Sequence, residues 1–501
     1  MLRRTSLATA VLMAGALALT ACSAEQTPAP STSAVADPNA SVTLRMVAEP
    51  GNLDIRETAG AALDQLLIDN VYQGLVSRTP EQDIVPALAS DYEVSDDGLT
   101  YTFTLREGVV FHDGQPLTPQ DVVWSLTQVR DNPAFRDSER LAGMSAVTAD
   151  GQTITITLSQ PDSSFLWNLT GRAGLVLKEG DATDRKTAAN GTGPFTLASW
   201  RQGDSVTLQR FDGYWGDPAG VGEVVFAYIP ETQAALNAAL AGEVDVVTGF
   251  DANLSEQIEA NGDFAVEVGA STDKGTLAMN PAEGPLADVR VRQAIRQAID
   301  NEAIVEALGA GQTQYGPIPE LDPGHEDLSD VAPYDPDAAR ELLAEAGAED
   351  IDLTLTIPSF YGTTVSQILV SNLHDVGVTL EVDAVEFSAW LTDVYMNRDY
   401  ELSFVLHTEA RDFENWADPE YYFGYDNPEV QELFAQSLAA TDEAEAAELL
   451  AEAARIVSED HAADWLYNGA SVVAVGDSIA GMPTVNVNER LNLAEITKSE
   501  G

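Results

Sequence analysis

The stretch GTGPFTLASWRQGDSVTLQRFDGYWG, residues 191–216, says more about the fold than any other part of this sequence. Two runs rich in β-forming residues, 195–200 and 205–211, flank the polar turn at 201–204, and this arrangement predicts a β-hairpin. The aromatic pair Tyr214-Trp215 follows directly. On physical grounds alone, the stretch predicts a two-stranded ribbon closed by an aromatic plug.

Three other segments share their pattern with a known family. They are the opening segment with Asn52-Leu53-Asp54 and Tyr72-Gln73-Gly74-Leu75, the block TYTFTLREGVVFHDGQPLTPQDVVWSL at 100–126, and DVRVRQAIRQAIDNEAIV at 288–305. Together with 191–216 they resemble the peptide/nickel-type extracellular solute-binding proteins (solute-binding family 5), which feed ABC importers. The resemblance covers nearly all of the chain after its N-terminal segment.

The resemblance implies an α/β, two-lobed fold like that of periplasmic binding proteins (type II, cluster C), with an extra subdomain in the first lobe at about residues 70–180. The chain is rich in strands up to about residue 272. Strands and helices then alternate, which predicts a parallel sheet. We expect a first lobe at 42–273 and 470–501, and a second α/β lobe inserted at 274–469. Two crossings between lobes suit hinge closure around a ligand.

Capping residues mark the helix starts. Thr118 is followed by Pro119 and Asp121, which predicts an N-cap with proline in the first turn. The same reasoning predicts helices that begin after Asp288, Asp300, Asp335, Asn427 and Asp442. His112 lies in the FHDG turn of the second block, and we interpret it as a structural residue and not as a ligand.

Residues 1–21 have the features of a signal peptide. Arg3 and Arg4 precede the apolar run 7–19, which is too short to span a membrane. The run ends in Leu-Thr-Ala-Cys, which resembles a bacterial lipobox, and Cys22 is the only cysteine. We expect Cys22 to be lipidated, residues 22–41 to form a flexible tether, and the protein to be held on the outer face of the cell membrane. The alternative is a plain secreted protein with an incidental cysteine.

The composition excludes some classes of function. The chain has 501 residues, too many for one hydrophobic core, and a net charge of −56. A polyanion of this size repels phosphate backbones, so we expect no nucleic-acid partner. A solvated acidic surface explains the charge, and adaptation to a salty host is a second explanation. With a single cysteine, the chain can form neither an internal disulfide nor a cysteine-based metal site.

Ligands of open α/β sheets bind beyond the carboxyl ends of the parallel strands. The predicted strand 351–357 runs into Phe360 and Tyr361, and the predicted strand 401–406 runs into the loop HTEARDFENW at 407–416. This loop places an imidazole, a guanidinium, three carboxylates and two aromatic rings within ten residues. A solvated surface loop has a similar composition, so the residues alone leave its role open.

The resemblance favours a binding role for this loop. In peptide binders of the family, an acidic residue here holds the α-ammonium of the ligand, and a basic residue can meet its carboxylate. We therefore expect Asp412 to bind an amine, with Asp418 as a rival, and Arg411 to take a carboxylate or to balance Asp412. Trp416 and Tyr361 are the expected packing walls. The remaining candidate binding residues are Phe360, His407, Glu409 and, on the opposite wall, Glu49.

The resemblance thus predicts a monomeric, lipid-anchored binding protein for short peptides, which delivers its ligand to a transmembrane permease driven by ATPase subunits. An alternative keeps the importer role with an oligosaccharide, an opine or a nickel chelate. We expect no cofactor, because the five histidines show no paired spacing typical of a metal site. We also expect no enzymatic activity, because the sequence contains no GxSxG, HExxH or Walker motif.

Overall fold

The computed structural model describes residues 36–499. The chain from Ala36 onward forms one compact unit. The predicted signal peptide and Cys22 lie outside the described residues. Residues 36–41, expected at the end of the tether, contact the folded body: Ala36 pairs with Ser499, and the main-chain N–H of Asp37 donates to the carbonyl of Lys498 at 2.8 Å.

Residues 36–262 contain eleven strands. They are β1 (Ser41–Met46), β2 (Val76–Arg78), β3 (Ile84–Pro86), β4 (Ala89–Val94), β5 (Thr100–Leu105), β6 (Met144–Asp150), β7 (Thr153–Leu158), β8 (Phe195–Arg201), β9 (Ser205–Arg210), β10 (Glu223–Tyr228) and β11 (Val246–Thr248). Its α-helices are α1 (Ala61–Leu67), α2 (Pro119–Asp131), α3 (Phe165–Asn168), α4 (Thr232–Leu240) and α5 (Ser255–Glu259).

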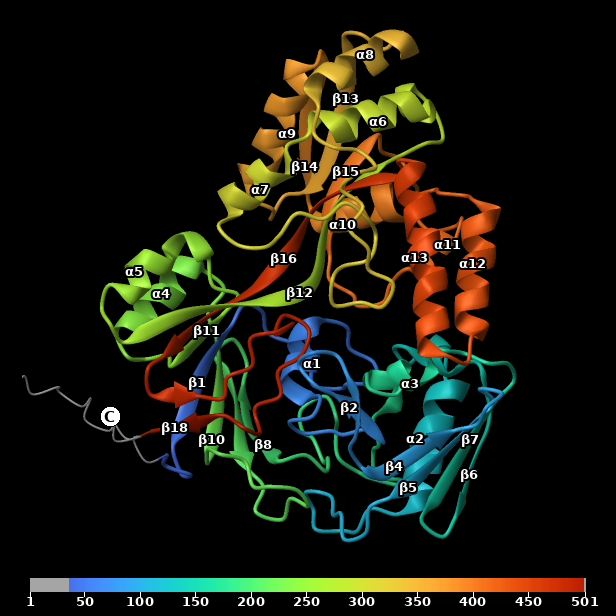
Figure 1. The fold of residues 1–501 in the computed structure, drawn as a ribbon. Coiled ribbons are helices and arrows are strands. Elements are labelled where there is room, and N and C mark those ends of the chain that lie inside the picture. Colours follow the sequence, from blue (N-terminus) through green and yellow to red (C-terminus); the bar gives the residue numbers. More distant parts are fainter. Residues whose placement is uncertain (1–35, 500–501) are drawn as a thin grey trace, which may run out of the picture. The chain divides into compact units, whose positions relative to one another are not determined.

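From residue 264 onward, helices and strands alternate (Figure 1). The strands are β12 (Phe264–Met279), β13 (Ile351–Pro358), β14 (Val378–Val385), β15 (Leu402–His407), β16 (Ala463–Gly476), β17 (Ile479–Ala480) and β18 (Thr497–Lys498). The helices are α6 (Val289–Ala298), α7 (Asn301–Leu308), α8 (Pro336–Ala346), α9 (Thr363–Asp375), α10 (Phe387–Trp390), α11 (Glu414–Ala417), α12 (Pro428–Ala439) and α13 (Glu443–Glu459).

One ten-stranded sheet runs through the protein in the order β14-β13-β15-β12-β16-β11-β1-β10-β9-β8. The predicted hairpin 195–211 is confirmed as β8 and β9, which pair antiparallel at the edge of this sheet. The predicted parallel arrangement is confirmed for β13, which pairs parallel with both β14 and β15. At the other end of the sheet, β1 pairs parallel with β10 and β11.

The long strands β12 and β16 connect the two ends of the sheet. They pair antiparallel with each other, and Figure 1 shows them side by side. Their pairing register shifts between Ala270 and Lys274. Before this shift, β12 pairs with the part of β16 that also pairs with β11. From Lys274 onward, β12 pairs with β15 as well. The expected boundaries at 273/274 and 469/470 therefore fall within β12 and β16, where the chain passes from one group of strands to the other.

A second, four-stranded sheet with the order β4-β5-β7-β6 lies within the region 70–180. It has its own hydrophobic core, which reaches from Leu75 to Val176 and includes Phe103, Phe111 and Phe165. His112 links this region to the stretch 191–216. Its ring lies 3.0 Å from the carbonyl of Gly193 and accepts from the N–H of Gly191 at 3.2 Å, which supports the structural role expected for it.

The predicted helix caps are confirmed. Thr118 and Asp121 form a reciprocal capping box with Pro119 in the first turn of α2. The remaining predicted N-caps accept hydrogen bonds from the first turns of α6, α7, α8, α12 and α13; they are Asp288, Asp300, Asp335, Asn427 and Asp442. Short polar side chains at these positions satisfy N–H groups that the helix itself leaves free.

Two elements differ from what the local sequence pattern predicts. The run 275–280 predicts a short strand, but β12 begins eleven residues earlier, because it continues through the polar run before Lys274 to pair with β16. The run 387–396 predicts one helix, but this helix is regular only as far as Trp390, and residues 391–396 continue as a π-helix. Among the described residues, no helix is both long and apolar enough to cross a membrane.

Candidate functional site

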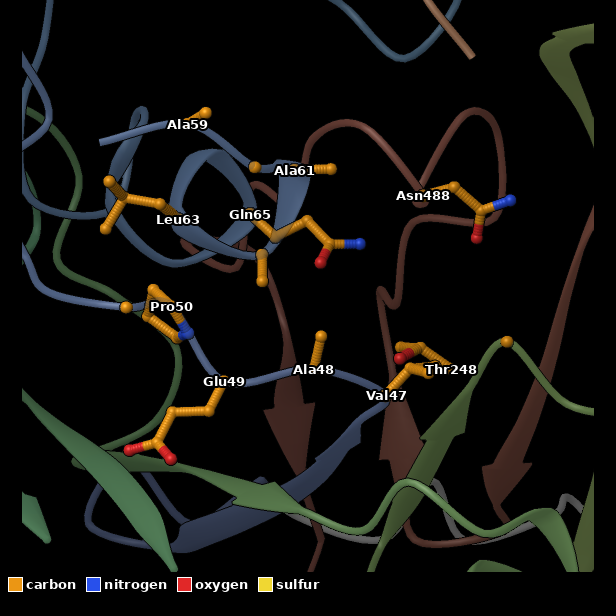
Figure 2. A pocket seen from close by; sticks show the side chains of 14 residues that line it. Val47, Ala48, Glu49, Pro50, Ala59, Ala61, Leu63, Gln65, Thr248 and Asn488 are labelled. Atoms are coloured by element: carbon orange, nitrogen blue, oxygen red, sulfur yellow. The ribbon is translucent and has the colours of Figure 1, made fainter. Parts of the chain in front are cut away.

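A cavity of about 350 Å³ lies where β1 and β11 end (Figure 2). Its walls are the segment after β1 (Val47 to Gly51), the start of α1 with the residues before it, Thr248 and Gly249 at the end of β11, and Asn488. Because β1 and β11 are parallel neighbours, their carboxyl ends meet at one edge of the sheet, where open α/β folds bind ligands. Its volume falls in the range of about 300–1,000 Å³ that is usual for ligand pockets.

The main chain along one wall of this first cavity is free of secondary structure. Within the described part of the chain, the peptide groups of Val47 to Gly51 form no backbone hydrogen bond. Val47 is 49% exposed, although the three residues before it in β1, Leu44 to Met46, are buried. This segment can therefore offer peptide N–H and C=O groups to a ligand without breaking an existing ladder.

Glu49 lies on this segment, but its carboxylate is engaged elsewhere. It accepts a hydrogen bond from the indole N–H of Trp200 at 2.9 Å and further bonds from the N–H of Gly203 at 2.9 and 3.0 Å. Figure 2 shows the carboxylate directed away from Gln65 and Asn488. Glu49 thus connects the wall of the first cavity to the turn of the β8–β9 hairpin.

A second cavity, of about 800 Å³, lies between the four-stranded sheet region and the helices α12 and α13. Residues of β3, β4 and α3 line one side, whereas the segments 317–323 and 411–414 and the two helices line the other. Hydrogen bonds join the two sides: the N–H of Ser163 donates to the carbonyl of Leu438 at 2.8 Å, and the Ser163 hydroxyl donates to the carbonyl of Ser437 at 2.9 Å.

Asp412 lines this second cavity and not the first. Its side chain is nearly buried, and its Oδ1 lies 3.1 Å from the ammonium group of Lys274. Lys274 is itself 3% exposed. Asp412, the residue expected to bind a ligand amine, therefore already has an ammonium group beside it, which belongs to Lys274 of β12. The role of Asp412 toward a ligand stays a prediction, but a ligand would meet a carboxylate whose charge is already compensated.

Arg411 also lines the second cavity, in an unusual backbone conformation with a φ of 55°. Its guanidinium carbon lies 3.8 Å from the centre of the Trp167 ring, and its buried Nε has no hydrogen-bond partner within the described residues. Its main-chain N–H donates to Asp322 at 2.6 Å. Burial raises the pKa of Asp322 to about 6 despite the opposing effect of Lys274. Arg411 thus joins the loop after β15 to the four-stranded sheet region by a cation–π contact.

The other predicted binding residues are distributed differently. Trp416 is 4% exposed and stacks on Phe423 at a ring distance of 4.0 Å, so it lies in the hydrophobic core and lines neither cavity. His407 is buried against Tyr422, and burial lowers its pKa. Tyr361 is half-buried and accepts a hydrogen bond from the N–H of Leu406 at 2.9 Å.

Three predicted residues lie at the surface of the same region. Phe360 is 65% exposed, and Glu409 is exposed at the end of β15. Asp418, the rival of Asp412, is exposed and caps the N–H of Glu420 at 2.9 Å. The structure therefore gives Asp418 a local role in a turn, whereas Asp412 and Glu414 are the carboxylates of the loop 407–416 that line a cavity.

The structure also brings together His407, Glu409 and Asp412, which the sequence placed in one loop. Their ligating atoms all lie within 4.8 Å of one another, a grouping that a metal ion could use. However, the ammonium of Lys274 lies 3.1 Å from Asp412, and a divalent cation would have to bind beside that positive charge. The positive charge of Lys274 disfavours a metal site here.

The family profile described as bacterial extracellular solute-binding proteins, family 5 (middle), matches residues 83–428, which is more than half of the chain. The chain belongs to this family. It is a solute-binding protein of the kind that serves ABC importers, and the family consists of substrate-binding proteins that act outside the cytoplasm and not of enzymes. The predicted two-lobed α/β class is confirmed by the solved structures described next.

Two relatives show the extent of the sequence similarity. The glutathione-binding protein GsiB of Pectobacterium atrosepticum is 28% identical over 423 residues, which cover 77% of this chain and 80% of that protein. The dipeptide-binding protein of Escherichia coli K12 is 29% identical over 372 residues, which cover 67% of this chain and 69% of that protein.

Two solved structures show the similarity of the fold. The periplasmic binding protein DppA from Helicobacter pylori, in complex with the peptide STSA, superposes with a TM-score of 0.79 at 23% identity, covering 92% of this chain and 98% of that one. NikZ from Campylobacter jejuni, in complex with Ni(L-His), has a TM-score of 0.77 at 19% identity and covers 91% and 99%. At these identities, the comparisons show the fold alone.

The sequence did not draw attention to several residues of the site. Lys274 is one of four lysines in the chain and stands in a strand pattern, and a lysine in such a position signals a buried ion pair. No comparable signal marks Gln65, Thr248 and Asn488, which reach the first cavity from distant parts of the chain. Asn488 donates to Asp273 at 2.9 Å and so connects this cavity to β12.

Proposed function

We propose that this protein captures short peptides outside the cytoplasm and delivers them to the permease of an ABC importer. The observation that carries the proposal is the free main chain of Val47 to Gly51 beside the first cavity. Every peptide presents the same backbone N–H and C=O groups. A wall that binds them through its own peptide groups tolerates many side-chain sequences.

The lining of the first cavity supports a peptide of varied sequence. Ala48, Ala59, Ala61 and Ala62 leave space for a ligand side chain, and the polar side chains of Gln65, Thr248 and Asn488 are few. Within residues 36–499, none of the residues that line this cavity is basic, so the cavity itself offers no obvious site for a phosphate or another strong anion. The names of the glutathione- and dipeptide-binding relatives point to the same class of ligand.

The proposal also covers the anchoring of the protein and the delivery of the ligand. Lipidation of Cys22 holds the protein on the outer face of the membrane. The loop 407–416 contacts the ligand when the lobes close, and a permease with its ATPase subunits then receives the ligand from the monomer. The lipobox-like run before Cys22 supports the anchor. The strands β12 and β16, which join the two groups of strands, support a hinge between the lobes.

Isothermal titration calorimetry of the full-length protein tests this function. The probes are alanine peptides of two to five residues, each with a free and with an acetylated amino end, and the chelate Ni(L-His). We expect micromolar or tighter binding of at least one peptide. Ala48→Trp places a large ring in the first cavity and should weaken that binding at least tenfold. Ala149→Trp, at an exposed position of β6, is the matched control and should leave it unchanged.

Two results would contradict the proposed function. One is binding of Ni(L-His) with no binding of any peptide, which would keep the importer role but change the class of ligand. The other is an unchanged peptide affinity in Ala48→Trp, which would place the ligand outside the first cavity.

A further inference from the structure

Lys274 is an unusual residue for its position. It lies in β12 at the point where the pairing with β16 changes register, and its side chain is 3% exposed. Lysine is almost never fully buried unless it is paired, because an ammonium ion loses its hydration there. Burial lowers the pKa of Lys274, but Asp412, Asp322 and Glu409 outweigh this effect and raise the pKa, so the group is charged.

The ammonium of Lys274 has a complete set of partners. It has three N–H donors. It donates to the carbonyl of Glu409 at 2.7 Å and to the carbonyl of Thr272 at 3.1 Å, and it lies 3.1 Å from Asp412 Oδ1. One carboxylate and two main-chain carbonyls thus enclose an ammonium group that belongs to the chain itself.

This arrangement lies at a wall that a ligand can reach. Asp412 lines the second cavity, and among the described residues its other carboxylate oxygen has only a long contact, 3.5 Å, with the amide of Asn415. A ligand ammonium at this wall would either face Lys274 at short range or displace it from Asp412. In the first case two like charges repel each other, and in the second a buried lysine loses its counter-ion.

We propose that Lys274 determines ligand specificity, and that the protein takes peptides whose end next to Asp412 carries no positive charge, such as N-acylated or cyclic peptides. This inference rests on the proposed function and names its substrate class. It concerns the end of the ligand that extends beyond the first cavity to the loop 407–416 and lies beside Asp412. Besides Asp412, the second cavity is lined by the carboxylates of Asp322 and Glu414 on the same side and by those of Asp83, Glu139, Asp162 and Glu443 on other walls.

The test compares two forms of each peptide by calorimetry. We expect the wild-type protein to bind N-acetylated alanine peptides at least tenfold more tightly than the same peptides with a free amino end. Lys274→Met removes the intrinsic ammonium and should reduce this ratio at least tenfold. Lys178→Met is the control, because Lys178 pairs with Asp113 away from both cavities, and it should keep the wild-type ratio.

The ratio of the affinities for the acetylated and the free peptide separates an effect on specificity from an effect on stability. A purely structural role of Lys274 would weaken the binding of both forms of a peptide alike. A wild-type preference for the free amino end, or the same ratio in Lys274→Met as in the wild type, would overturn the inference while leaving the proposed function intact. Failure of every peptide to bind would instead overturn the proposed function.

A second measurement needs no variant and applies even if Lys274→Met does not fold. Molecules released by denaturation from the wild-type protein are treated with dansyl chloride, which labels primary amines, and are analysed by mass spectrometry beside a blank preparation. Released molecules without a labelled α-amine support the inference. Released molecules that carry a labelled α-amine overturn it.

Discussion

Replacement of Asp412 by asparagine tests the buried ion pair with Lys274. The two charged atoms lie 3.1 Å apart with side-chain exposures of 3% and 11%. At the effective dielectric constant of about 20 that suits such sites, the attraction is about 5 kcal/mol. The asparagine oxygen can still accept a hydrogen bond from Lys274, and Asp322 lies nearby, so part of this energy is retained. We expect Asp412→Asn to lower the free energy of unfolding by about 3 kcal/mol.

Urea denaturation followed by tryptophan fluorescence measures this loss. Asp131→Asn is the matched control, since the Arg130–Asp131 pair at the end of α2 is largely exposed, at 24% and 56%, and should contribute less than about 1 kcal/mol. The double variant Asp412→Asn with Lys274→Met should recover part of the stability, because it removes the uncompensated ammonium. Equal losses in Asp412→Asn and Asp131→Asn would refute the reasoning.

Three further predictions concern Glu49, Asp322 and Thr118. Glu49→Ala removes the carboxylate that accepts from Trp200 and Gly203, and it should weaken peptide binding about tenfold in calorimetry, whereas Glu49→Gln keeps one acceptor and should lose less. The folded protein binds the Asp322 proton more tightly than the unfolded chain does, since its pKa is raised from 3.8 to about 6. The free energy of unfolding should therefore fall by up to about 3 kcal/mol as pH rises from about 4 to about 6, and Asp322→Asn should remove that part of the fall. An unchanged pH profile in Asp322→Asn would contradict this reading. Thr118→Ala breaks the capping box of α2 and should lower the melting temperature, by an amount that corresponds to about 1 kcal/mol; an unchanged melting temperature would show that the cap contributes little.

The secondary structure could be predicted where local physics decides it. Asp335-Pro336 and Gly347 delimit α8 because the aspartate accepts from the first turn and the glycine adopts a φ of 69° that other residues avoid. The alternation of apolar residues at 351–357 predicted β13 for a similar reason: one face of the strand packs on the core.

The first half of β12 could not be predicted in the same way. Residues 264–270 are mostly exposed or half-buried, and they form a strand because β16, about two hundred residues further on, supplies the hydrogen-bond partners. The π-helical turn at 391–396 likewise has no local signature that separates it from an α-helix. Long-range pairing decides such elements, and a single sequence does not display it.

In the candidate site too, the sequence predicted the features that depend on local residues and missed those that depend on long-range contacts. The sequence identified the loop after β15 from its charges and aromatic rings, and Asp412 and Arg411 of that loop do line a cavity. The sequence alone did not distinguish Trp416, which is buried in the hydrophobic core, from residues that face a cavity. It also did not pair Asp412 with Lys274, because these residues lie far apart in the chain and meet only where β12 and β15 pair.

The capture of short peptides is tested most directly by mass spectrometry. The protein is purified without added ligand, and the small molecules that it releases on denaturation are analysed. A blank preparation carried through the same steps provides the control. We expect a set of short peptides of varied sequence that is absent from the blank. Recovery of sugars, opines or a metal chelate in place of peptides would contradict peptide capture as the function of this protein.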